Sequence, residues 1–161
     1  MSQTITGLSV GTVAPDFELK DQHGAKISLS SFKGAKNVVV LFIPFAFTGT
    51  CTGELCAIRD DLATFQNDEV QVLAISCDSP FTQKVFAEQE GYKFPVLSDF
   101  WPHGATATSY QIFNEDLGQC IFHSHQGSLT RSDQNQTGSC QFNRKAQALN
   151  RCWRSKRRKI T

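Results

Sequence analysis

Cys51 stands at the point in the sequence where a thiol is best placed to act as a nucleophile. It follows an apolar stretch typical of a buried strand and opens a segment with helical spacing. The free amide N–H groups and the positive dipole end of a helix N-terminus favour an anion, so we expect the pKa of Cys51 to fall below the free value of about 8.5. Thr48 lies three residues earlier, and its hydroxyl could accept from the thiol or donate to a bound oxygen. This pair predicts thiolate chemistry.

The residues just before Thr48 favour the same interpretation. Pro44 would pack over the site without adding a competing N–H donor. The rings of Phe45 and Phe47 would form a dry wall, an apolar surface that excludes water from the site and so strengthens electrostatic interactions nearby. The alternative is that Cys51 is a small buried apolar residue, as most free cysteines are. The order of strand, proline, threonine, cysteine and helix makes catalysis as good an interpretation as that alternative.

Strand and helix segments alternate around this cysteine. Residues 37–43 read NVVVLFI and residues 70–76 read VQVLAIS, which predicts two strands buried on both faces of a parallel sheet. Between them, residues 51–66 carry apolar residues at helical spacing, namely Leu55, Ile58, Leu62 and Phe65. A strand that leads directly into the reactive cysteine and its helix is therefore expected.

Further elements extend this alternation. Ser79 and Pro80 predict the cap and first position of a second helix, which ends by Gly91. Residues 94–97 read as a short extended piece, and residues 105–113 as a third helix. This order predicts an α/β fold with a central, mainly parallel sheet flanked by helices. Active sites in such folds lie beyond the carboxyl ends of the strands, where the reactive segment falls.

Charge divides the chain at residue 118. Residues 1–118 hold 7 Lys and Arg against 14 Asp and Glu, a net charge of −7, whereas residues 119–161 hold 9 against one, a net charge of +8. The second part is polar and aperiodic, and it shows no convincing strand or amphipathic helix. We therefore expect a domain at 1–118 and an atypical basic tail at 119–161 that is incomplete or poorly ordered.

Four segments resemble the peroxiredoxin family. Residues 44–51, PFAFTGTC, match the P-x-x-x-T-x-x-C signature, which is a specific four-part motif. Residues 14–17 resemble the entry motif of the family, and residues 53–60 resemble the helix after its reactive cysteine. Residues 98–104, SDFWPHG, look like a segment of the one-cysteine alkyl hydroperoxide reductase E group. The resemblance covers residues 10–118.

This resemblance implies a thioredoxin-like fold and a thiol-dependent peroxidase. Cys51 would reduce hydrogen peroxide and organic hydroperoxides and cycle through sulfenic acid, with Thr48 and Pro44 completing the site. A thioredoxin-like or low-molecular-weight thiol would return it to the reduced state. The resemblance also implies a homodimer and requires no metal or organic cofactor.

Two further residues of the same helix could take part. Cys56 stands at the offset of the resolving cysteine in Q-type peroxiredoxins. An intact helix keeps it away from Cys51, so their pairing requires the first turns to unwind. The alternative is a structural role for this small residue. Glu54 could tune the site or receive a proton, or it could simply complement the helix dipole.

The chain departs from the family pattern after Gly118. The family places an arginine on a later strand, but residues 121–123, Ile-Phe-His, hold none, and Arg59 does not match that position by motif. Losing one such donor costs about a hundredfold in rate. Two rival functions follow: an impaired peroxiredoxin remnant, and another thiol oxidoreductase of the thioredoxin fold, against which the absence of a C-x-x-C motif argues. Our hypothesis is that the tail is a displaced reading frame or a replaced terminus.

Other chemistry-bearing residues favour structural roles. Cys77 stands at the end of a strand, where a small buried residue is expected. Phe100 and Trp101 are expected to pack as walls rather than to contact a ligand. His103 could contact substrate, but a satisfied loop histidine is the preferred interpretation.

Metal, membrane and nucleic-acid functions are not expected. A zinc site would have to combine residues at no standard spacing, namely Cys120, His123 and His125 with Cys140 or Cys152. The longest apolar run, residues 38–47, is too short to span a bilayer, and the absence of a secretory signal favours the cytoplasm. The basic run at residues 151–159 matches no nucleic-acid module.

Overall fold

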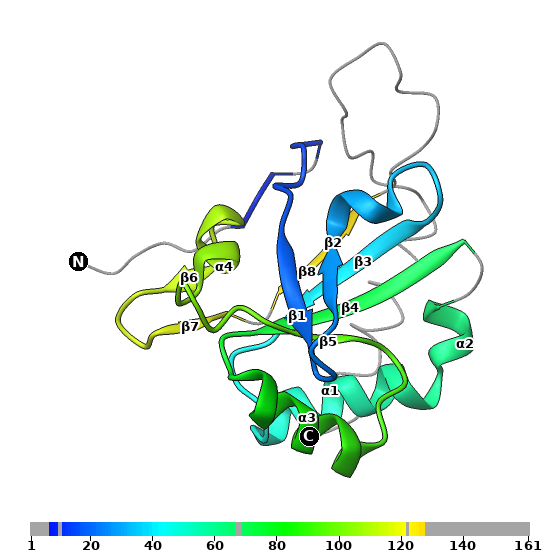
Figure 1. Cartoon of the computed structure of the whole chain (residues 1–161), viewed down its shortest axis with the longest axis vertical. Helices are drawn as coiled ribbons and strands as arrows, with labels where there is room; N and C mark the ends of the chain where they lie inside the picture. Colours follow the sequence, from blue (N-terminus) through cyan, green and yellow to red (C-terminus); the bar gives the residue numbers. More distant parts are fainter. Residues whose placement is uncertain (1–6, 10, 67–68, 122, 128–161) are drawn as a thin grey trace.

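A mixed sheet with helices on both faces forms the molecule (Figure 1). The computed structural model describes residues 7–9, 11–66, 69–121 and 123–127. Its elements are, in chain order, β1 (Glu18–Asp21), β2 (Lys26–Ser28), the 3-10 helix η1 (Leu29–Phe32), β3 (Asn37–Phe42), α1 (Gly49–Asp60), α2 (Leu62–Phe65), β4 (Val70–Ser76), α3 (Pro80–Glu90), β5 (Val96–Ser98), α4 (Ala105–Ser109), β6 (Phe113–Asn114), β7 (Gln119–Cys120) and β8 (His123–Gly127).

The central strands of the sheet are parallel, as the sequence predicts. The strand order is β2-β1-β5-β4-β3-β8, and β3, β4 and β5 run parallel to one another. Antiparallel strands extend both sides, with β1 and β2 beyond β5, and β8 beyond β3. A separate two-stranded sheet pairs β6 with β7. The sheet is therefore parallel at its centre and mixed as a whole.

Strand β3 contributes to two cores, because successive side chains of a strand point to opposite faces. Val39 and Leu41 belong to a cluster with apolar residues of α1 and α3. Val38 and Val40 belong to a second cluster with residues around α4, β6 and β7. All four are buried, which confirms the prediction of a strand covered on both faces. Figure 1 shows α1, α2 and α3 on one side of the sheet and α4 on the other.

Helix α3 begins and ends as the sequence predicts. Ser79 is the N-cap, and its hydroxyl oxygen accepts from the N–H of Thr82 at 3.2 Å. Pro80 occupies the first helical turn, where its missing N–H costs no hydrogen bond. Gly91 ends the helix in the left-handed region, with φ of 69°.

Two helices differ from the prediction. The single helix expected over residues 51–66 begins earlier, at Gly49, and divides into α1 and α2 at Asp61, whose φ of −121° is not helical. Aspartate favours such breaks because its side chain competes for neighbouring backbone groups. The helix expected over residues 105–113 ends at Ser109, and Gln111 with φ of 58° turns the chain toward β6.

The prediction that no strand follows Gly118 is wrong. Strand β7 pairs with β6, and β8 adds to the edge of β3, with His125 opposite Val40 in the register. Main-chain hydrogen bonds hold such a strand whatever its side-chain pattern, and an exposed sheet edge accepts it. Residues 128–161, which hold most of the basic tail, lie outside the described part. The division of the chain at residue 118 stays a prediction.

The β6–β7 hairpin packs tightly against the start of α4. Gly104 precedes the helix with φ of 68°, and a Cβ at this position would overlap the ring of Phe113. The ring nitrogen Nε2 of His103 lies 2.7 Å from the carbonyl oxygen of Gly118. Both contacts fix the hairpin to the body of the molecule.

None of the helices in the described residues is long and apolar enough to cross a membrane.

Candidate active site

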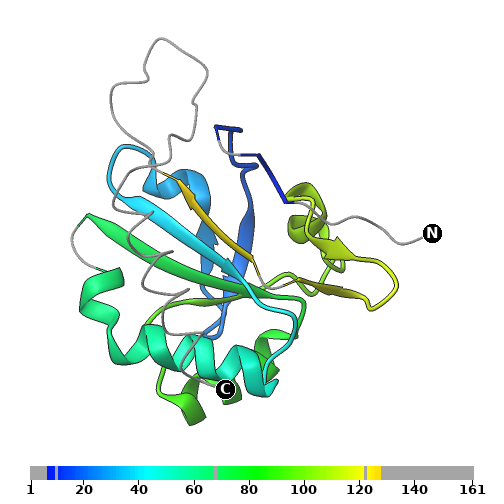
Figure 2. The ribbon, with the colours of Figure 1, turned by 180° about the vertical axis from the view of Figure 1, so that it is seen from behind.

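The segment between β3 and α1 forms the candidate active site. The N–H of Ile43 donates to the carbonyl of Ile75 at 2.9 Å, so the strand pairing with β4 continues up to Pro44. Pro44 is half-buried and cannot extend the ladder, because it has no N–H. The chain then turns away from the sheet and enters α1, as Figure 2 shows. This is the carboxyl end of a central parallel strand, where the sequence places the site.

Thr48 is the N-cap residue of α1. Its backbone is extended, with φ of −82° and ψ of 130°, and its carbonyl accepts the first helical bond from the N–H of Thr52 at 2.9 Å. Its hydroxyl makes no capping bond and instead donates to the carbonyl of Phe45 at 3.0 Å. The hydroxyl proton is therefore used, while the oxygen lone pairs can still accept a hydrogen bond.

Phe47 adopts a backbone conformation that is rare for a bulky residue. Its φ is 61°, in the left-handed region, which costs on the order of 1–3 kcal/mol and persists only where the surroundings enforce it. Its ring meets that of Phe86 of α3 edge to face, with centroids 5.0 Å apart. The side chain is half exposed, so Phe47 supplies only part of the dry wall that the sequence predicts.

The backbone of Cys51 lies in the first turn of α1, as predicted. The first helical turn has N–H groups without partners inside the helix, and these favour an anion. Glu54 follows in the same helix. The side chains of Cys51 and Glu54 lie outside the described part of the structure.

Asp78 is a site residue that sequence reasoning missed. It follows the end of β4, and its Oδ2 accepts from the N–H of Ala46 at 2.7 Å. This bond ties the loop before Thr48 to the neighbouring strand, 32 positions along the chain. A polar residue just past the end of the adjacent parallel strand was the available signal, because carboxyl ends of parallel strands meet at one edge.

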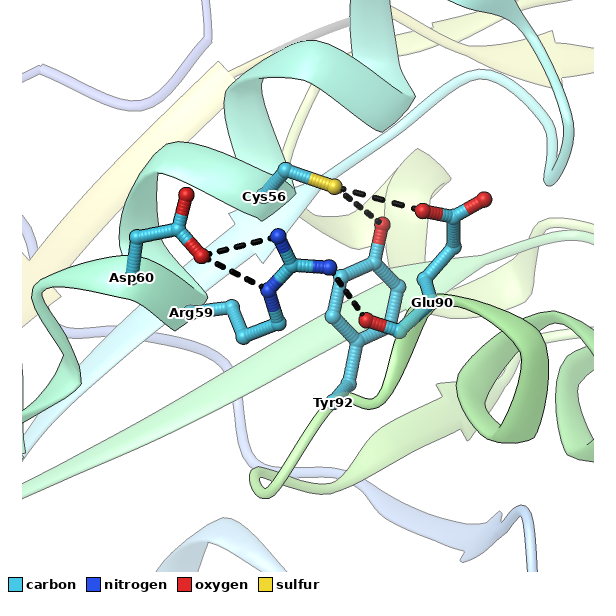
Figure 3. Close-up of polar contacts among 5 residues, drawn as sticks. All are labelled: Cys56, Arg59, Asp60, Glu90 and Tyr92. Atoms are coloured by element: carbon cyan, nitrogen blue, oxygen red, sulfur yellow. Dashed lines mark hydrogen bonds and ion pairs between the residues drawn. The ribbon is translucent and has the colours of Figure 1, made fainter.

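Cys56 lies in a polar cluster between α1 and the end of α3 (Figure 3). Its thiol donates to Glu90 Oε2 at 3.3 Å and lies 3.9 Å from the hydroxyl of Tyr92. Burial, followed by the bond to Glu90, raises the pKa of Cys56 above its ordinary value. The thiol therefore stays protonated, the opposite of what a nucleophile needs.

Arg59 joins the same cluster. Its guanidinium bonds Asp60 Oδ1 at 2.8 Å and donates to the carbonyl of Glu90, which ties α1 to α3. It is the one arginine in the part of the chain that the structure describes, and it is engaged here. Burial also raises the pKa of the Tyr92 phenol, so this hydroxyl is neutral.

Cys77 and Cys120 pack together in the second core cluster, both nearly inaccessible to solvent. The Cys120 thiol donates to the carbonyl of Ile43 at 2.8 Å. Contact with Cys77, together with burial, raises the pKa of Cys120 well above its ordinary value. The structural role predicted for Cys77 agrees with this burial.

The segment after β5 departs from the prediction in part. Phe100 and Trp101 are 50% and 84% exposed, so the prediction that they pack as walls is wrong. They stand between a buried Asp99 and α4, and the loop carries them outward. His103 bonds the hairpin, as expected for a satisfied loop histidine.

Comparisons with known proteins agree with this architecture. A model of the AhpC/TSA family matches residues 10–134. Alkyl hydroperoxide reductase E of Mycobacterium tuberculosis (strain ATCC 25618 / H37Rv) is 52% identical over 111 residues, which are 69% of this chain and 72% of that protein. Peroxiredoxin Bcp of Escherichia coli (strain K12) is 41% identical over 92 residues, 57% of this chain and 58% of that protein.

Solved structures give the same result. Peroxidoxin BcpB from Mycobacterium tuberculosis superposes with a TM-score of 0.64 at 32% identity, covering 73% of this chain and 76% of that chain. A reduced 2-Cys peroxiredoxin from Plasmodium vivax superposes with a TM-score of 0.66 at 24% identity, covering 74% and 78%, which shows the shared fold.

The chain belongs to the AhpC/TSA family of peroxiredoxins and has the thioredoxin-like fold that the motif predicts. It is a thiol-dependent peroxidase, an enzyme that reduces a peroxide at the expense of a thiol.

Proposed function

We propose that the chain reduces hydrogen peroxide and organic hydroperoxides through Cys51. The observation that carries this proposal is the join between β3 and α1. Cys51 lies in the first helical turn, three residues after an N-cap residue whose oxygen is free to accept. Amide N–H groups and an acceptor oxygen beside one sulfur are what the reaction needs.

The reaction is a displacement at oxygen. The Cys51 thiolate attacks the terminal oxygen of the peroxide, a sulfur–oxygen bond forms, and the oxygen–oxygen bond breaks. The electron pair leaves with the second oxygen, which takes a proton and departs as an alcohol or water. Thr48 accepts from the peroxide OH, and the first-turn amides stabilise the charge that develops on the leaving oxygen. Pro44 covers the site without offering a competing donor.

A thiol then reduces the sulfenic acid. Its attack on the Cys51 sulfur releases water and leaves a mixed disulfide, which a second thiol opens. The environment of Cys56 favours an external thiol, of thioredoxin or of a small molecule, over an internal one. Burial, together with the bond to Glu90, keeps its thiol protonated, and α1 is intact from Gly49 to Asp60. A resolving role for Cys56 remains the second candidate, and it requires α1 to unwind.

A homodimer in the cytoplasm is the proposed working form. Large apolar side chains are exposed on the site loop, on α3 and after β5, and a second copy would cover them. They are Phe47, Phe81, Val85, Phe100 and Trp101. The free thiols of Cys56, Cys77 and Cys120 suit a reducing compartment. Sedimentation at micromolar concentration tests the dimer, and a monomer at every concentration contradicts it.

Stopped-flow oxidation with hydrogen peroxide and with cumene hydroperoxide tests the reaction. Both peroxides are expected to add one oxygen to Cys51, read by mass spectrometry of the peptides. Cys51→Ser is expected to slow peroxide reduction by roughly a thousandfold or more, as removal of a nucleophile does. The five other cysteines stay in this variant and serve as its internal control. Unchanged peroxide reduction by Cys51→Ser contradicts the proposal.

A further inference from the structure

The loop that leads into α1 is held in a conformation it would not adopt alone. Phe47 has a φ of 61°, and Thr48 follows it directly as the N-cap residue. On one side, the Phe47 ring contacts Phe86. On the other side, Ala46 is buried, and its N–H points to Asp78 Oδ2 at 2.7 Å. Relaxation of this loop would turn the Thr48 hydroxyl away from its present position.

Asp78 is itself fixed by the ends of two strands. Its Oδ2 also accepts from the Ser76 hydroxyl at 2.8 Å. Its backbone carbonyl accepts from the hydroxyl of Ser98, at the end of β5, at 2.6 Å. One carboxylate oxygen thus receives two donors, one from the loop and one from β4, while β5 holds the main chain.

Gln83 of α3 orients the Ser76 hydroxyl that donates to Asp78. Its Nε2 donates to Ser76 Oγ at 3.1 Å and to the carbonyl of Leu97 at 2.6 Å, and the side chain is fully buried. Because Gln83 donates to the Ser76 oxygen, the Ser76 proton is left for Asp78. A continuous series of bonds therefore runs from α3 through β4 to the active-site loop.

We propose that Asp78 is a positioning residue for the peroxidase reaction: its Oδ2 anchors the Ala46 amide and so sets the place of Thr48 and of the first turn of α1. The proposal rests on the proposed role of Cys51. Asp78 acts through the loop and does not touch the peroxide. Its geometry is what matters, since one correctly placed oxygen accepts both donors, and its charge is secondary.

Two substitutions separate geometry from charge. Asp78→Asn keeps an oxygen that can accept from Ala46 and Ser76 but removes the charge. Asp78→Glu keeps the charge and displaces the oxygens by one methylene. We expect Asp78→Glu to slow Cys51 oxidation by hydrogen peroxide about a hundredfold, because misplacement by about 1 Å costs that much. Asp78→Asn is expected to retain most of the rate.

The readouts are the second-order rate constant for oxidation and the pH dependence of Cys51 alkylation by iodoacetamide, resolved by peptide mass spectrometry. The alkylation pKa is expected to rise in Asp78→Glu and to stay unchanged in Asp78→Asn, a change that lost stability alone would not produce.

Ser76→Ala removes one donor to Asp78 without touching the loop, and it is expected to slow oxidation less than Asp78→Glu. It supplies the test if Asp78→Glu does not fold. Asp116→Asn, an exposed acid in the β6–β7 turn, is the charge control.

Three results overturn the proposal: wild-type rates in both Asp78→Glu and Ser76→Ala, a slower Asp78→Asn than Asp78→Glu, or a lower unfolding temperature with an unchanged rate and alkylation pKa. Failure of the underlying function is recognised separately. Cys51→Ser would then reduce peroxide as the wild type does, whereas failure of the positioning role alone leaves Cys51→Ser inactive.

Discussion

The first turn of α1 and the turn that carries Cys56 offer a thiol opposite environments on one helix. Cys51 lies where helix amides favour a thiolate, after an N-cap residue that can accept a hydrogen bond. Five residues on, Cys56 is partly buried and faces the Glu90 carboxylate, and burial, followed by the bond to Glu90, raises its pKa. The residue type and the helix are the same, so we propose that the surroundings decide which thiol is reactive. Three experiments test this contrast.

Removal of the Thr48 hydroxyl is expected to slow the reaction most. Thr48→Val keeps the shape of the side chain but removes the hydroxyl, and with it the acceptor proposed for the peroxide. We expect the rate of Cys51 oxidation by hydrogen peroxide to fall about a hundredfold, the usual loss for one such group. Thr48→Ser, the matched control, keeps the hydroxyl and is expected to retain most of the rate. Equal rates in the two variants would remove Thr48 from the mechanism.

A several-fold effect is expected at Cys56. Glu90→Gln removes the carboxylate charge that faces the thiol, so the pKa of Cys56 is expected to fall. In a Cys51→Ser background, alkylation of Cys56 at pH 8 is expected to become several-fold faster. Glu88→Gln makes the same charge change on an exposed position of α3 and is the control. No difference between the two variants would show that Glu90 does not hold this thiol protonated.

The smallest effect is a change in alkaline stability. The Tyr92 phenol has a raised pKa in the folded protein, so above its ordinary value of 10 the unfolded chain ionises while the folded chain does not. Stability is then lost as the pH rises above about 10. Tyr92→Phe is expected to give a shallower fall of the thermal unfolding midpoint between pH 9 and pH 11. A fall as steep as that of the wild type would contradict the assignment.

Much of the architecture could be predicted from local patterns. The β-branched runs of β3 and β4 are buried on both faces. A continuous apolar run of this kind has few stable structures other than a buried parallel strand. Ser79, Pro80 and Gly91 mark the ends of α3 by backbone chemistry that acts within a few residues. The position of Cys51 in the first helical turn follows from the same kind of local signal.

What could not be predicted depends on partners distant in sequence. Asp78 meets Ala46, 32 positions away in the chain, only because β3 and β4 lie side by side, so its partner could not be read from its neighbours in sequence. Cys56 reads as a candidate partner of Cys51 by spacing, yet its neighbour in the fold is Glu90, from another helix. Strand β8 was not predicted because its pairing with the edge of β3 depends on main-chain hydrogen bonds, which leave no pattern in the side chains.

Gly104 lies far from Cys51 in the sequence, yet its lack of a side chain bears on the position of the loop before Cys51. Any side chain there would displace Phe113 and, with it, the hairpin whose second strand carries Cys120. The Cys120 thiol holds the carbonyl of Ile43, the last residue before Pro44. The missing side chain of Gly104 thus helps to position the loop between β3 and α1 from the opposite face of the sheet. A larger residue at position 104 would shift this loop without contacting Cys51.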